Sequence, residues 1–253
     1  MAPAAALAIV HPMNAPTMAR GLPAAGTGWR TPSALRKEPA ADGAASTVGL
    51  IEALGTRGAV ARGSSLFFDG DRTENYYRIA SGAVELVKLL PDGRRQIADF
   101  PVVGDFFGFA AGSRHNTSAE ALNDAIIVRY PRQMIDSLVR TQPSIAAWLV
   151  ARLSASLSAA QTQMLLLGRK TARERLASFL LQYASRLELA GSRWQPLHLP
   201  MRRVDIADYL GLTEETVSRT FTALRDEGAI ETARPDGIRF RDRALLEQLA
   251  EAA

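Results

Sequence analysis

The chain contains no cysteine, which excludes disulfide bonds, thiolate metal sites, iron–sulfur clusters and cysteine nucleophiles. Its three histidines, His11, His115 and His198, the side chains that could be axial haem ligands, are expected in loops or at the surface, which does not favour a haem site. No apolar run approaches the roughly 20 residues that a membrane-spanning helix needs, and the first residues lack the basic start of a secretory signal. We therefore expect a cytoplasmic protein with no membrane partner and no cofactor.

The chain has 253 residues, which leaves room for two modest domains, and its net charge is only +4. Residues 168–253 carry 14 basic and 13 acidic side chains, a net charge of +1, so any non-specific affinity for nucleic acid should be moderate and salt-sensitive. There is no glycine-rich phosphate loop, paired-acid motif or Ser–His–Asp set. The composition thus gives no support to an enzyme.

The most informative stretch is RVDIADYLGLTEETVSRTFT, residues 203–222, which has the pattern of two helices joined by a tight turn. Ile206, Ala207 and Leu210 follow helical spacing and should face inward. Gly211 stands where the first helix must stop in a left-handed conformation. Thr213 is a good N-cap for the next helix. This order of residue types is typical of a helix-turn-helix.

The second helix of this motif should be buried on one face and polar on the other. Val217 and Phe221, four residues apart, are expected to point inward. The outward face then presents two carboxylates, a hydroxyl and a guanidinium, from Glu214, Glu215, Ser218 and Arg219. These groups can read base edges in a DNA major groove, although an ordinary amphipathic helix pair would show similar spacing.

The segments around the motif favour the DNA-binding interpretation. Residues 171–189 form an amphipathic pattern before it. After it, Gly228 ends the second helix, and two short strands are expected at 230–233 and 238–241, with the turn signal Arg-Pro-Asp-Gly between them. A helix, a helix-turn-helix and a hairpin wing together predict a winged helix-turn-helix domain over residues 168–253.

The N-terminal half has a different pattern. Residues 1–46 are rich in Ala, Pro, Gly and Thr and are expected to be a disordered extension. Residues 47–60 read as a short helix. From residue 65 to about 130, short apolar runs alternate with glycine-containing turns, which is typical of a small β-barrel or sandwich. We expect one such domain over residues 47–130.

Between these domains, residues 131–167 show a helical period with one long apolar stripe. Two explanations are compatible, packing against the barrel of the same chain and pairing with a second copy as a coiled coil; the length of the stripe favours a dimer. Gly168 would then be the hinge to the DNA-binding domain. The stripe consists of Leu149, Leu153, Leu157, Ala160, Met164 and Leu167.

In this order, the barrel, the long helix and the reading head resemble the cyclic-AMP receptor and fumarate–nitrate regulator (Crp/Fnr) superfamily over about residues 47–250. In the barrel, the matching runs are SSLFFDGDRTENYYRIASGAVELVK and DGRRQIADFPVVGDFFGF; in the reading head, RRVDIADYLGLTEETVSRTFTAL is similar to the FixK branch. The resemblance implies an α+β chain: a jelly-roll barrel like that of cyclic-nucleotide-binding domains, a long dimerisation helix and a C-terminal winged helix-turn-helix.

The resemblance also implies how the DNA is read. Fumarate–nitrate regulators and FixK proteins carry Glu-x-x-Ser-Arg on the recognition helix, here Glu215, Ser218 and Arg219. Arg219 would read a guanine and Glu215 its paired cytosine, or Glu215 would brace Arg219. The implied site is an inverted repeat close to TTGAT-NNNN-ATCAA, bound by a homodimer that acts on RNA polymerase as an activator of microaerobic, respiratory or nitrogen-fixation genes. The expected phosphate-positioning residues are Arg202, Arg203, Thr213 and Thr216.

The expected β-barrel lacks the sequence motifs by which cyclic-AMP-binding members of this superfamily hold their ligand. Cyclic-AMP binders of this superfamily carry a Gly-Glu pair followed by an Arg-Ser pair that holds the cyclic phosphate. The stretch GDFFGFAAGSRHNTSAEA has neither pair, and His115-Asn116 stand where Arg-Ser would be. The resemblance therefore implies DNA binding without a nucleotide, cluster or haem. The alternative is a regulator, activator or repressor, gated by haem or by an effector whose binding motif the sequence does not show.

Overall fold

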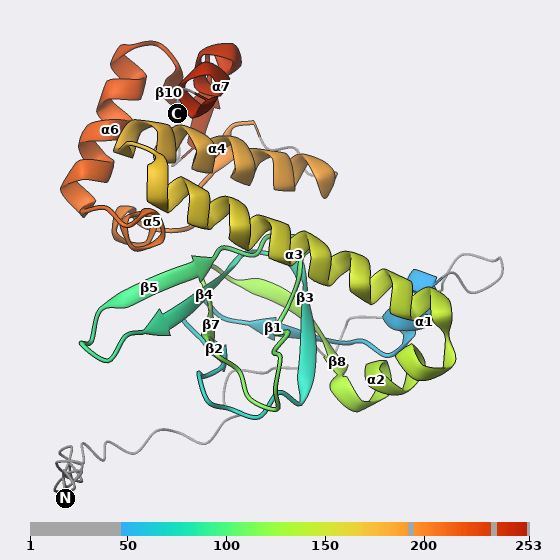
Figure 1. The fold of residues 1–253 in the computed structure, drawn as a ribbon. Helices are drawn as coiled ribbons and strands as arrows, with labels where there is room; N and C mark the ends of the chain where they lie inside the picture. The colour runs from blue at the N-terminus through green and yellow to red at the C-terminus, as the bar shows by residue number, and fades with distance from the viewer. Residues whose placement is uncertain (1–46, 192–194, 234–236, 252–253) are drawn as a thin grey trace, which may run out of the picture.

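The computed structural model describes residues 47–191, 195–233 and 237–251 (Figure 1). The N-terminal extension expected over residues 1–46, and residues 234–236 of the expected wing turn, lie outside these ranges. A β-sandwich lies on one side of a long helix, and a mostly helical domain lies at the far end of that helix. None of the helices in the described ranges combines the length and the apolar character needed to cross a membrane.

The N-terminal domain consists of two four-stranded antiparallel sheets, with strand orders β1-β8-β3-β6 and β2-β7-β4-β5. Inward residues alternate along the strands, as in β3, where Tyr77 and Ile79 are buried. They meet Phe67, Phe107 and Ile127 in a core between the sheets. The strands are β1 Thr56–Val60, β2 Ser65–Phe67, β3 Asn75–Ser81, β4 Val84–Leu89, β5 Arg95–Asp99, β6 Phe106–Phe107, β7 Ser118–Ala121 and β8 Ala125–Pro131.

Two helices follow the sandwich. Helix α2 covers Arg132–Thr141 and is capped by Gln142. Helix α3, Pro143–Arg169, begins with a proline at its first position, where the missing N–H removes no helical hydrogen bond. The start of α3 packs on the sandwich: Trp148 meets Phe106 edge to face, with ring centroids 4.9 Å apart. The remainder of α3 runs out to the DNA-binding domain (Figure 1).

The C-terminal domain begins with α4, Ala172–Leu189, whose N-terminus is closed by a reciprocal capping box between Thr171 and Glu174. Its buried face carries Leu176, Phe179, Leu180 and Tyr183, as the sequence pattern predicts. The other elements are the strand β9, Leu197–His198; α5, Arg203–Leu210; α6, Glu214–Asp226; the wing strands β10, Ile230–Ala233, and β11, Gly237–Phe240; and α7, Arg243–Glu251. β9 pairs with β11, so the wing belongs to a three-stranded sheet.

Several boundaries differ from the sequence-based expectations. The first helix, α1, covers only Thr47–Ala53, and Thr56–Val60 is a strand because it pairs with β8 across the sheet. Gly168 is not a hinge; α3 continues to Arg169 and is capped at Lys170, whose N–H donates to the Leu166 carbonyl. The short strands β6, β7 and β9 and the helix α7 have no sequence signal that we recognised.

Candidate nucleic-acid interface

The turn between α5 and α6 has the geometry that its residues predict. Gly211 adopts a left-handed conformation with φ of 61°, which a side chain with a Cβ would strain. Its N–H closes α5 on the Ala207 carbonyl. The Thr213 hydroxyl then accepts a hydrogen bond from the Thr216 N–H at 3.2 Å and caps α6. The two helices are therefore fixed to each other by local backbone chemistry.

Helix α6 separates its buried and exposed faces as expected. Val217 and Phe221 are buried against α4 and α5, together with Leu224. On the opposite side lies a shallow, open hollow at the surface, lined by Glu214, Glu215, Ser218 and Arg219. The structure thus places all four of the proposed outward residues on one exposed face.

The charges on this face are arranged favourably for the helix and remain available to a partner. Glu214 and Glu215 stand in the first turn of α6, where negative charge stabilises the helix dipole. Within the described residues no ion pair joins Glu215 to Arg219, so the two side chains do not brace each other in the free protein. The Arg219 guanidinium is exposed and can offer two donors to a guanine edge.

Arg202 lies just before α5 and is tied to Asp205. Its guanidinium contacts both carboxylate oxygens of Asp205, at 3.1 Å and 3.0 Å, and its backbone N–H donates to the same carboxylate at 2.9 Å. Burial raises the pKa of the Asp205 carboxyl, but the hydrogen bonds from Arg202 outweigh it and hold that pKa below its usual value. The Arg202 side chain remains mostly exposed, and a phosphate would compete with Asp205 for it.

Arg203 is placed differently from its neighbour. Its guanidinium carbon lies 3.3 Å from the centroid of the Phe221 ring, and burial lowers the pKa of the side chain. This cation–π contact joins α5 to α6. Thr213 and Thr216, the other residues expected to position phosphate, lie together at the start of α6 with their hydroxyl oxygens 3.0 Å apart.

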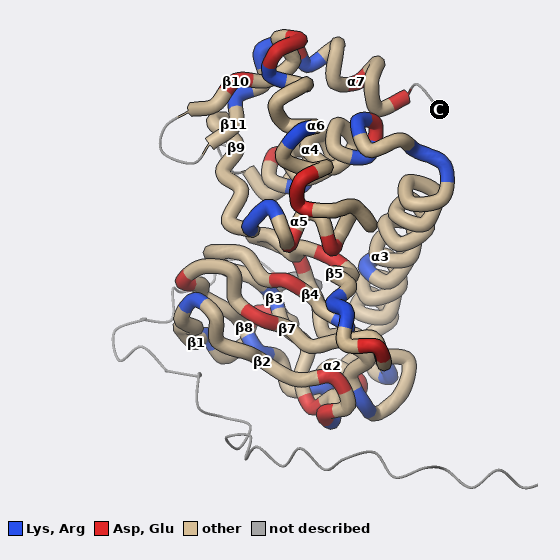
Figure 2. Tube along the Cα trace, turned by 90° about the vertical axis from the view of Figure 1, so that its left-hand side faces the viewer, with Lys and Arg blue, Asp and Glu red and all other residues tan. Residues whose placement is uncertain are grey.

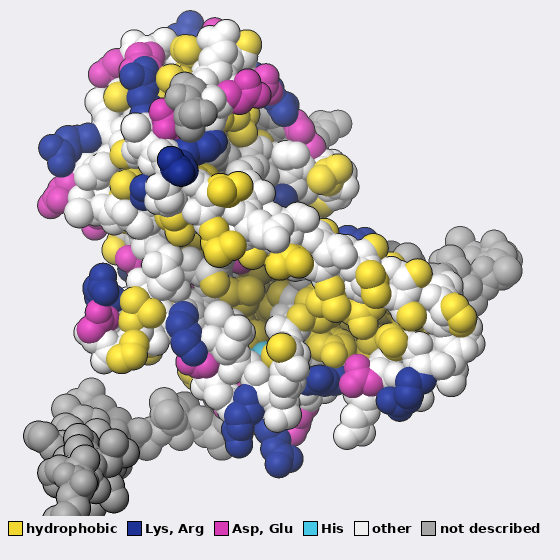
Figure 3. All heavy atoms as spheres, viewed as in Figure 1, with side chains coloured by type: hydrophobic (Ala, Val, Ile, Leu, Met, Phe, Trp, Pro, Cys, Tyr) yellow, Lys and Arg dark blue, Asp and Glu magenta, His cyan; other side chains and the backbone are white. Residues whose placement is uncertain are grey.

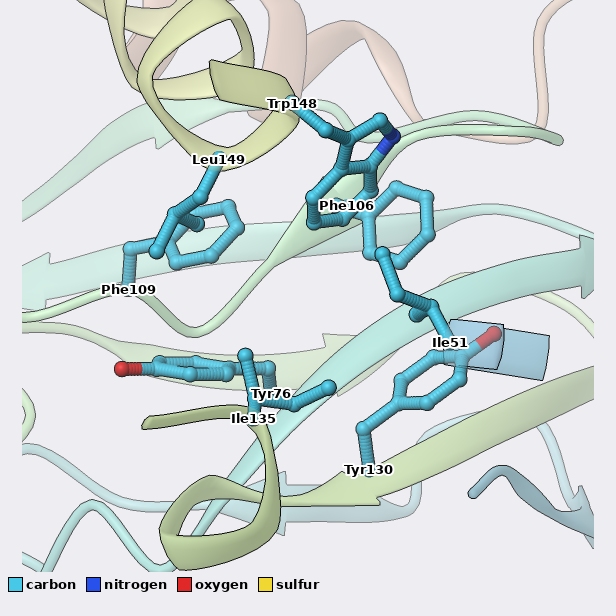
Figure 4. A pocket seen from close by; sticks show the side chains of 8 residues that line it. All are labelled: Ile51, Tyr76, Phe106, Phe109, Tyr130, Ile135, Trp148 and Leu149. Atoms are coloured by element: carbon cyan, nitrogen blue, oxygen red, sulfur yellow. The ribbon is translucent and has the colours of Figure 1, made fainter. Parts of the chain in front are cut away.

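The apolar stripe on α3 is covered at its two ends and bare in the middle. Leu149 and Trp148 close a small pocket over Tyr76, Phe106 and Tyr130 of the sandwich (Figure 4). At the other end, Leu166 and Leu167 pack into the core of the C-terminal domain.

Between these ends, three large residues of the stripe are exposed: Leu153 at 43%, Leu157 at 60% and Met164 at 66%. Ala160, between them, is exposed too. Figure 3 shows hydrophobic side chains along this helix. The ends of the stripe thus pack against their own chain, and its middle lies open to a partner.

The interior of the sandwich is filled by aromatic side chains. The imidazole of His115 stacks on Phe67 with ring centroids 3.7 Å apart, and Tyr77 lies 5.3 Å from Phe67 on the same centroid measure. His115 lies in the loop between β6 and β7, within the expectation of a loop or surface position, but it is buried rather than at the surface: it is only 5% exposed, and burial lowers its pKa. His198 is exposed on β9, and His11 lies outside the described residues.

A residue that sequence reasoning missed is Arg175, which joins three helix ends. Its guanidinium donates to the carbonyls of Leu167 and Lys170, at 2.8 Å each, and to that of Leu210 at 2.9 Å. A positive charge at the C-terminal carbonyls of α3 and α5 is favourable for both helix dipoles. In the sequence it is one of many arginines on a helix, so nothing separates it from a surface residue.

The fold and this exposed helix face define a transcription regulator with a helix-turn-helix reading head, rather than an enzyme. Residues 174–249 match the family model of the Crp-like helix-turn-helix domain, and residues 58–142 match that of the cyclic nucleotide-binding domain. The chain belongs to the Crp/Fnr family of DNA-binding transcription regulators and is FixK-like. The resemblance inferred from the sequence is confirmed.

Comparison with individual proteins leads to the same family. The nitrogen fixation regulation protein FixK of Azorhizobium caulinodans is 41% identical over 246 residues, 97% of this chain and 98% of that protein. The fumarate and nitrate reduction regulatory protein of Escherichia coli is 33% identical over 193 residues, 76% of this chain and 77% of that protein. Among solved structures, FixK2 from Bradyrhizobium japonicum superposes with a TM-score of 0.73 and 39% identity, covering 79% of this chain and 98% of that one.

Proposed function

We propose that this chain is a cytoplasmic, FixK-like transcription activator. It binds an inverted repeat close to TTGAT-NNNN-ATCAA as a homodimer, acts on RNA polymerase from there, and controls microaerobic, respiratory or nitrogen-fixation genes. The observation that carries the proposal is the exposed face of α6, where Glu215, Ser218 and Arg219 lie together on a helix that is capped by Thr213 and buried on its opposite face. The relatives named for nitrogen fixation regulation support the assignment of target genes.

Base reading follows from the chemistry of that face. Arg219 donates two hydrogen bonds to the N7 and O6 atoms of a guanine, and Glu215 accepts from the amino group of the paired cytosine. Ser218 adapts to a neighbouring base. Thr213 and Thr216, at the N-terminus of α6, contact phosphate where the helix dipole favours an anion. Arg202 adds a phosphate contact from its exposed position, and Arg203 lies beside it with its guanidinium on Phe221.

The homodimer is formed by the middle of α3. In the single chain, Leu153, Leu157 and Met164 of α3 expose apolar area to water that a second copy would bury. Pairing two α3 helices in parallel places the two α6 helices on one side of the dimer, about one DNA turn or roughly 34 Å apart. Such a dimer would have two-fold symmetry and would therefore read an inverted repeat.

DNA binding by this protein needs no small-molecule signal. Aromatic rings and the imidazole of His115 occupy the space between the sheets, where a nucleotide would have to displace them. The described residues contain no group of three or more His, Asp or Glu side chains that could hold a metal ion. As the FixK resemblance implies, activity would follow the amount of protein made or a protein partner.

The test is binding of the purified full chain to a fluorescent TTGAT-NNNN-ATCAA duplex with no added ligand. We expect tight binding that a duplex with scrambled half-sites does not reproduce, together with a visible spectrum free of a Soret band. Binding that appears only after addition of cyclic AMP, cyclic GMP or haem would contradict the ligand-independent mechanism. Equal affinity for both duplexes would contradict the operator assignment.

A further inference from the structure

The reading head is not a freely tethered module, because it shares a hydrophobic core with the sandwich. Phe100, directly after β5, lies 5.2 Å from Tyr209 of α5 and 6.1 Å from Phe179 of α4, measured between ring centroids. Val102 and Ile97 of the sandwich belong to the same buried cluster as the helix-turn-helix. Apolar packing holds the two domains together, but such packing is non-directional and does not by itself fix their angle.

A directional contact between the two domains is made by Arg186 of α4, whose guanidinium binds two carboxylates of the sandwich. Its Nη1 lies 2.8 Å from Asp99 Oδ1, and its Nη2 lies 3.2 Å from Asp99 Oδ2 and 2.6 Å from Asp105 Oδ2. A bidentate arginine–carboxylate pair is constrained in plane and direction, unlike a contact between point charges. Burial lowers the pKa of the guanidinium, but the attraction of the two carboxylates outweighs it and raises that pKa.

Both carboxylates are themselves held in place. Asp99 Oδ1 accepts the Phe100 N–H at 2.8 Å, and Asp105 Oδ2 accepts the Val102 N–H at 2.9 Å. The acceptors are therefore fixed to the backbone of the sandwich before Arg186 meets them. Because these hydrogen bonds already fix the side-chain conformations of the two aspartates, the contact with Arg186 allows little movement between α4 and the sandwich.

A second charged contact lies between the same domains, on α5. Arg95 of β5 reaches Asp205 at 3.3 Å and Asp208 at 3.8 Å, and the Gln96 amide donates to the Asp208 carbonyl at 2.8 Å. Figure 2 shows charged positions gathered where α5 lies over β5. The two polar contacts, that of Arg186 on α4 and that of Arg95 with α5, together restrict rotation of the reading head relative to the sandwich, which one contact alone would allow.

We propose that Arg186 is a positioning residue for DNA recognition, which fixes the angle of the reading head on the sandwich and so the half-site spacing that the dimer accepts. The proposal rests on the proposed dimeric binding of an inverted repeat. Each base pair added to a spacer moves the second half-site by about 3.4 Å and turns it by about 35°. A rigidly anchored head cannot follow such a turn, whereas a head released from Arg186 keeps only the α5 contacts and the shared apolar core, which restrict its rotation less.

The experiment measures affinity for duplexes that share both half-sites and differ only in spacers shortened or lengthened by one or two base pairs. The wild-type chain should favour one spacer by at least about tenfold, a difference of about 1.4 kcal/mol. Arg186→Gln should bring the ratio close to one while keeping its discrimination at the guanine of each half-site. Arg186→Lys, which retains the charge, should restore part of the preference.

The matched control is Arg243→Gln. Arg243 pairs with Glu188 of α4 at 3.0 Å, but both residues belong to the C-terminal domain, so the spacing preference should stay at the wild-type value. If Arg186→Gln fails to fold, Asp99→Asn and Asp105→Asn loosen the same contact from the sandwich side. A folded Arg186→Gln protein, or a folded aspartate double variant, that keeps the wild-type spacing preference would overturn the proposal.

A second readout separates this proposal from the operator assignment. Because the chain has no cysteine, Arg62→Cys on the sandwich and Arg225→Cys on α6 place two spin labels at chosen exposed sites. Labelled chains diluted with unlabelled protein should give a narrow distance distribution that Arg186→Gln broadens. An unchanged distribution overturns the anchoring role even if the wild-type chain binds no palindrome; a broadened one with no palindrome selected contradicts only the proposed operator.

Discussion

The guanidinium carbon of Arg203 lies over the ring of Phe221, 3.3 Å from its centroid, and this contact joins the two helices of the reading head. A cation over an aromatic face that is partly shielded from water stabilises by about 1–2 kcal/mol. Arg203→Ala should therefore lower the free energy of unfolding by about that amount, with Arg203→Leu recovering part of it through packing. Urea unfolding followed by circular dichroism measures the change.

The control for this prediction is Arg225→Ala, because Arg225 is an exposed arginine on α6, the helix that carries Phe221, with a single hydrogen bond to Thr222. Its loss should change stability by no more than about 0.5 kcal/mol, because it contributes little buried contact. Equal losses for the two variants would show that the contact with Phe221 adds nothing beyond an ordinary surface charge.

Arg202 should behave differently from Arg203, because its side chain is exposed and its partner is a carboxylate. We expect Arg202→Ala to weaken binding to all DNA sequences about equally and to reduce the slope of log affinity against log salt by about 1. Titrations at several salt concentrations, on specific and scrambled duplexes, give both quantities. A loss confined to the specific duplex would assign Arg202 to base reading.

The buried carboxyl of Glu85 gives the protein a pH-dependent stability. Arg95 contacts one of its oxygens at 2.5 Å, while the other is buried without a hydrogen-bond partner among the described residues. Burial raises its pKa from 4.5 to about 7; Arg95 and Arg202 oppose this shift, while Asp205 and Glu120 add to it.

The sign of the effect follows from proton linkage. The folded state binds the proton more tightly than the unfolded chain, so this contribution is complete below about pH 4.5 and is lost as the pH rises through about 7. Glu85→Gln should match the wild type near pH 4.5 and exceed it by on the order of 2 kcal/mol at pH 8. Parallel unfolding curves at the two pH values test this, and a constant difference would contradict it.

Dimerisation can be tested where α3 is bare. Leu153→Glu combined with Leu157→Glu should leave the fold intact, because both side chains are exposed in the single chain, but should place like charges in the proposed interface. Light scattering at micromolar concentration should show a dimer for wild type and a monomer for the variant, with DNA affinity falling in parallel. A wild-type monomer, or a variant that still dimerises, would rule out this surface.

The reading head could be predicted closely from the sequence because its signals are local. Gly211, Thr213 and Gly228 mark turns and caps that depend only on their own backbone conformation, and each lies where it was expected. The helical period that buries Val217 and Phe221 is equally local. The exposed face of α6 follows directly from these positions.

What could not be predicted depends on contacts between distant residues. The local pattern predicts a helix at Thr56–Val60, because the β8 residues with which this strand pairs lie about 70 positions away and no short pattern indicates the pairing. The inward position of His115 depends on Phe67 across the sandwich. The contacts of Arg186 and Arg95 join segments that are separate in the sequence, where both residues look like ordinary surface arginines.

The central claim is that Arg219 on the exposed face of α6 reads a guanine in a TTGA-type inverted repeat. Selection of binding sites from random duplex DNA with wild type and Arg219→Ala tests it most directly. The wild-type chain should enrich the palindrome, and Arg219→Ala should lose discrimination at the guanine of both half-sites, a loss of about 1–3 kcal/mol for each contact. Enrichment of no such palindrome, or full guanine discrimination by Arg219→Ala, would contradict the claim.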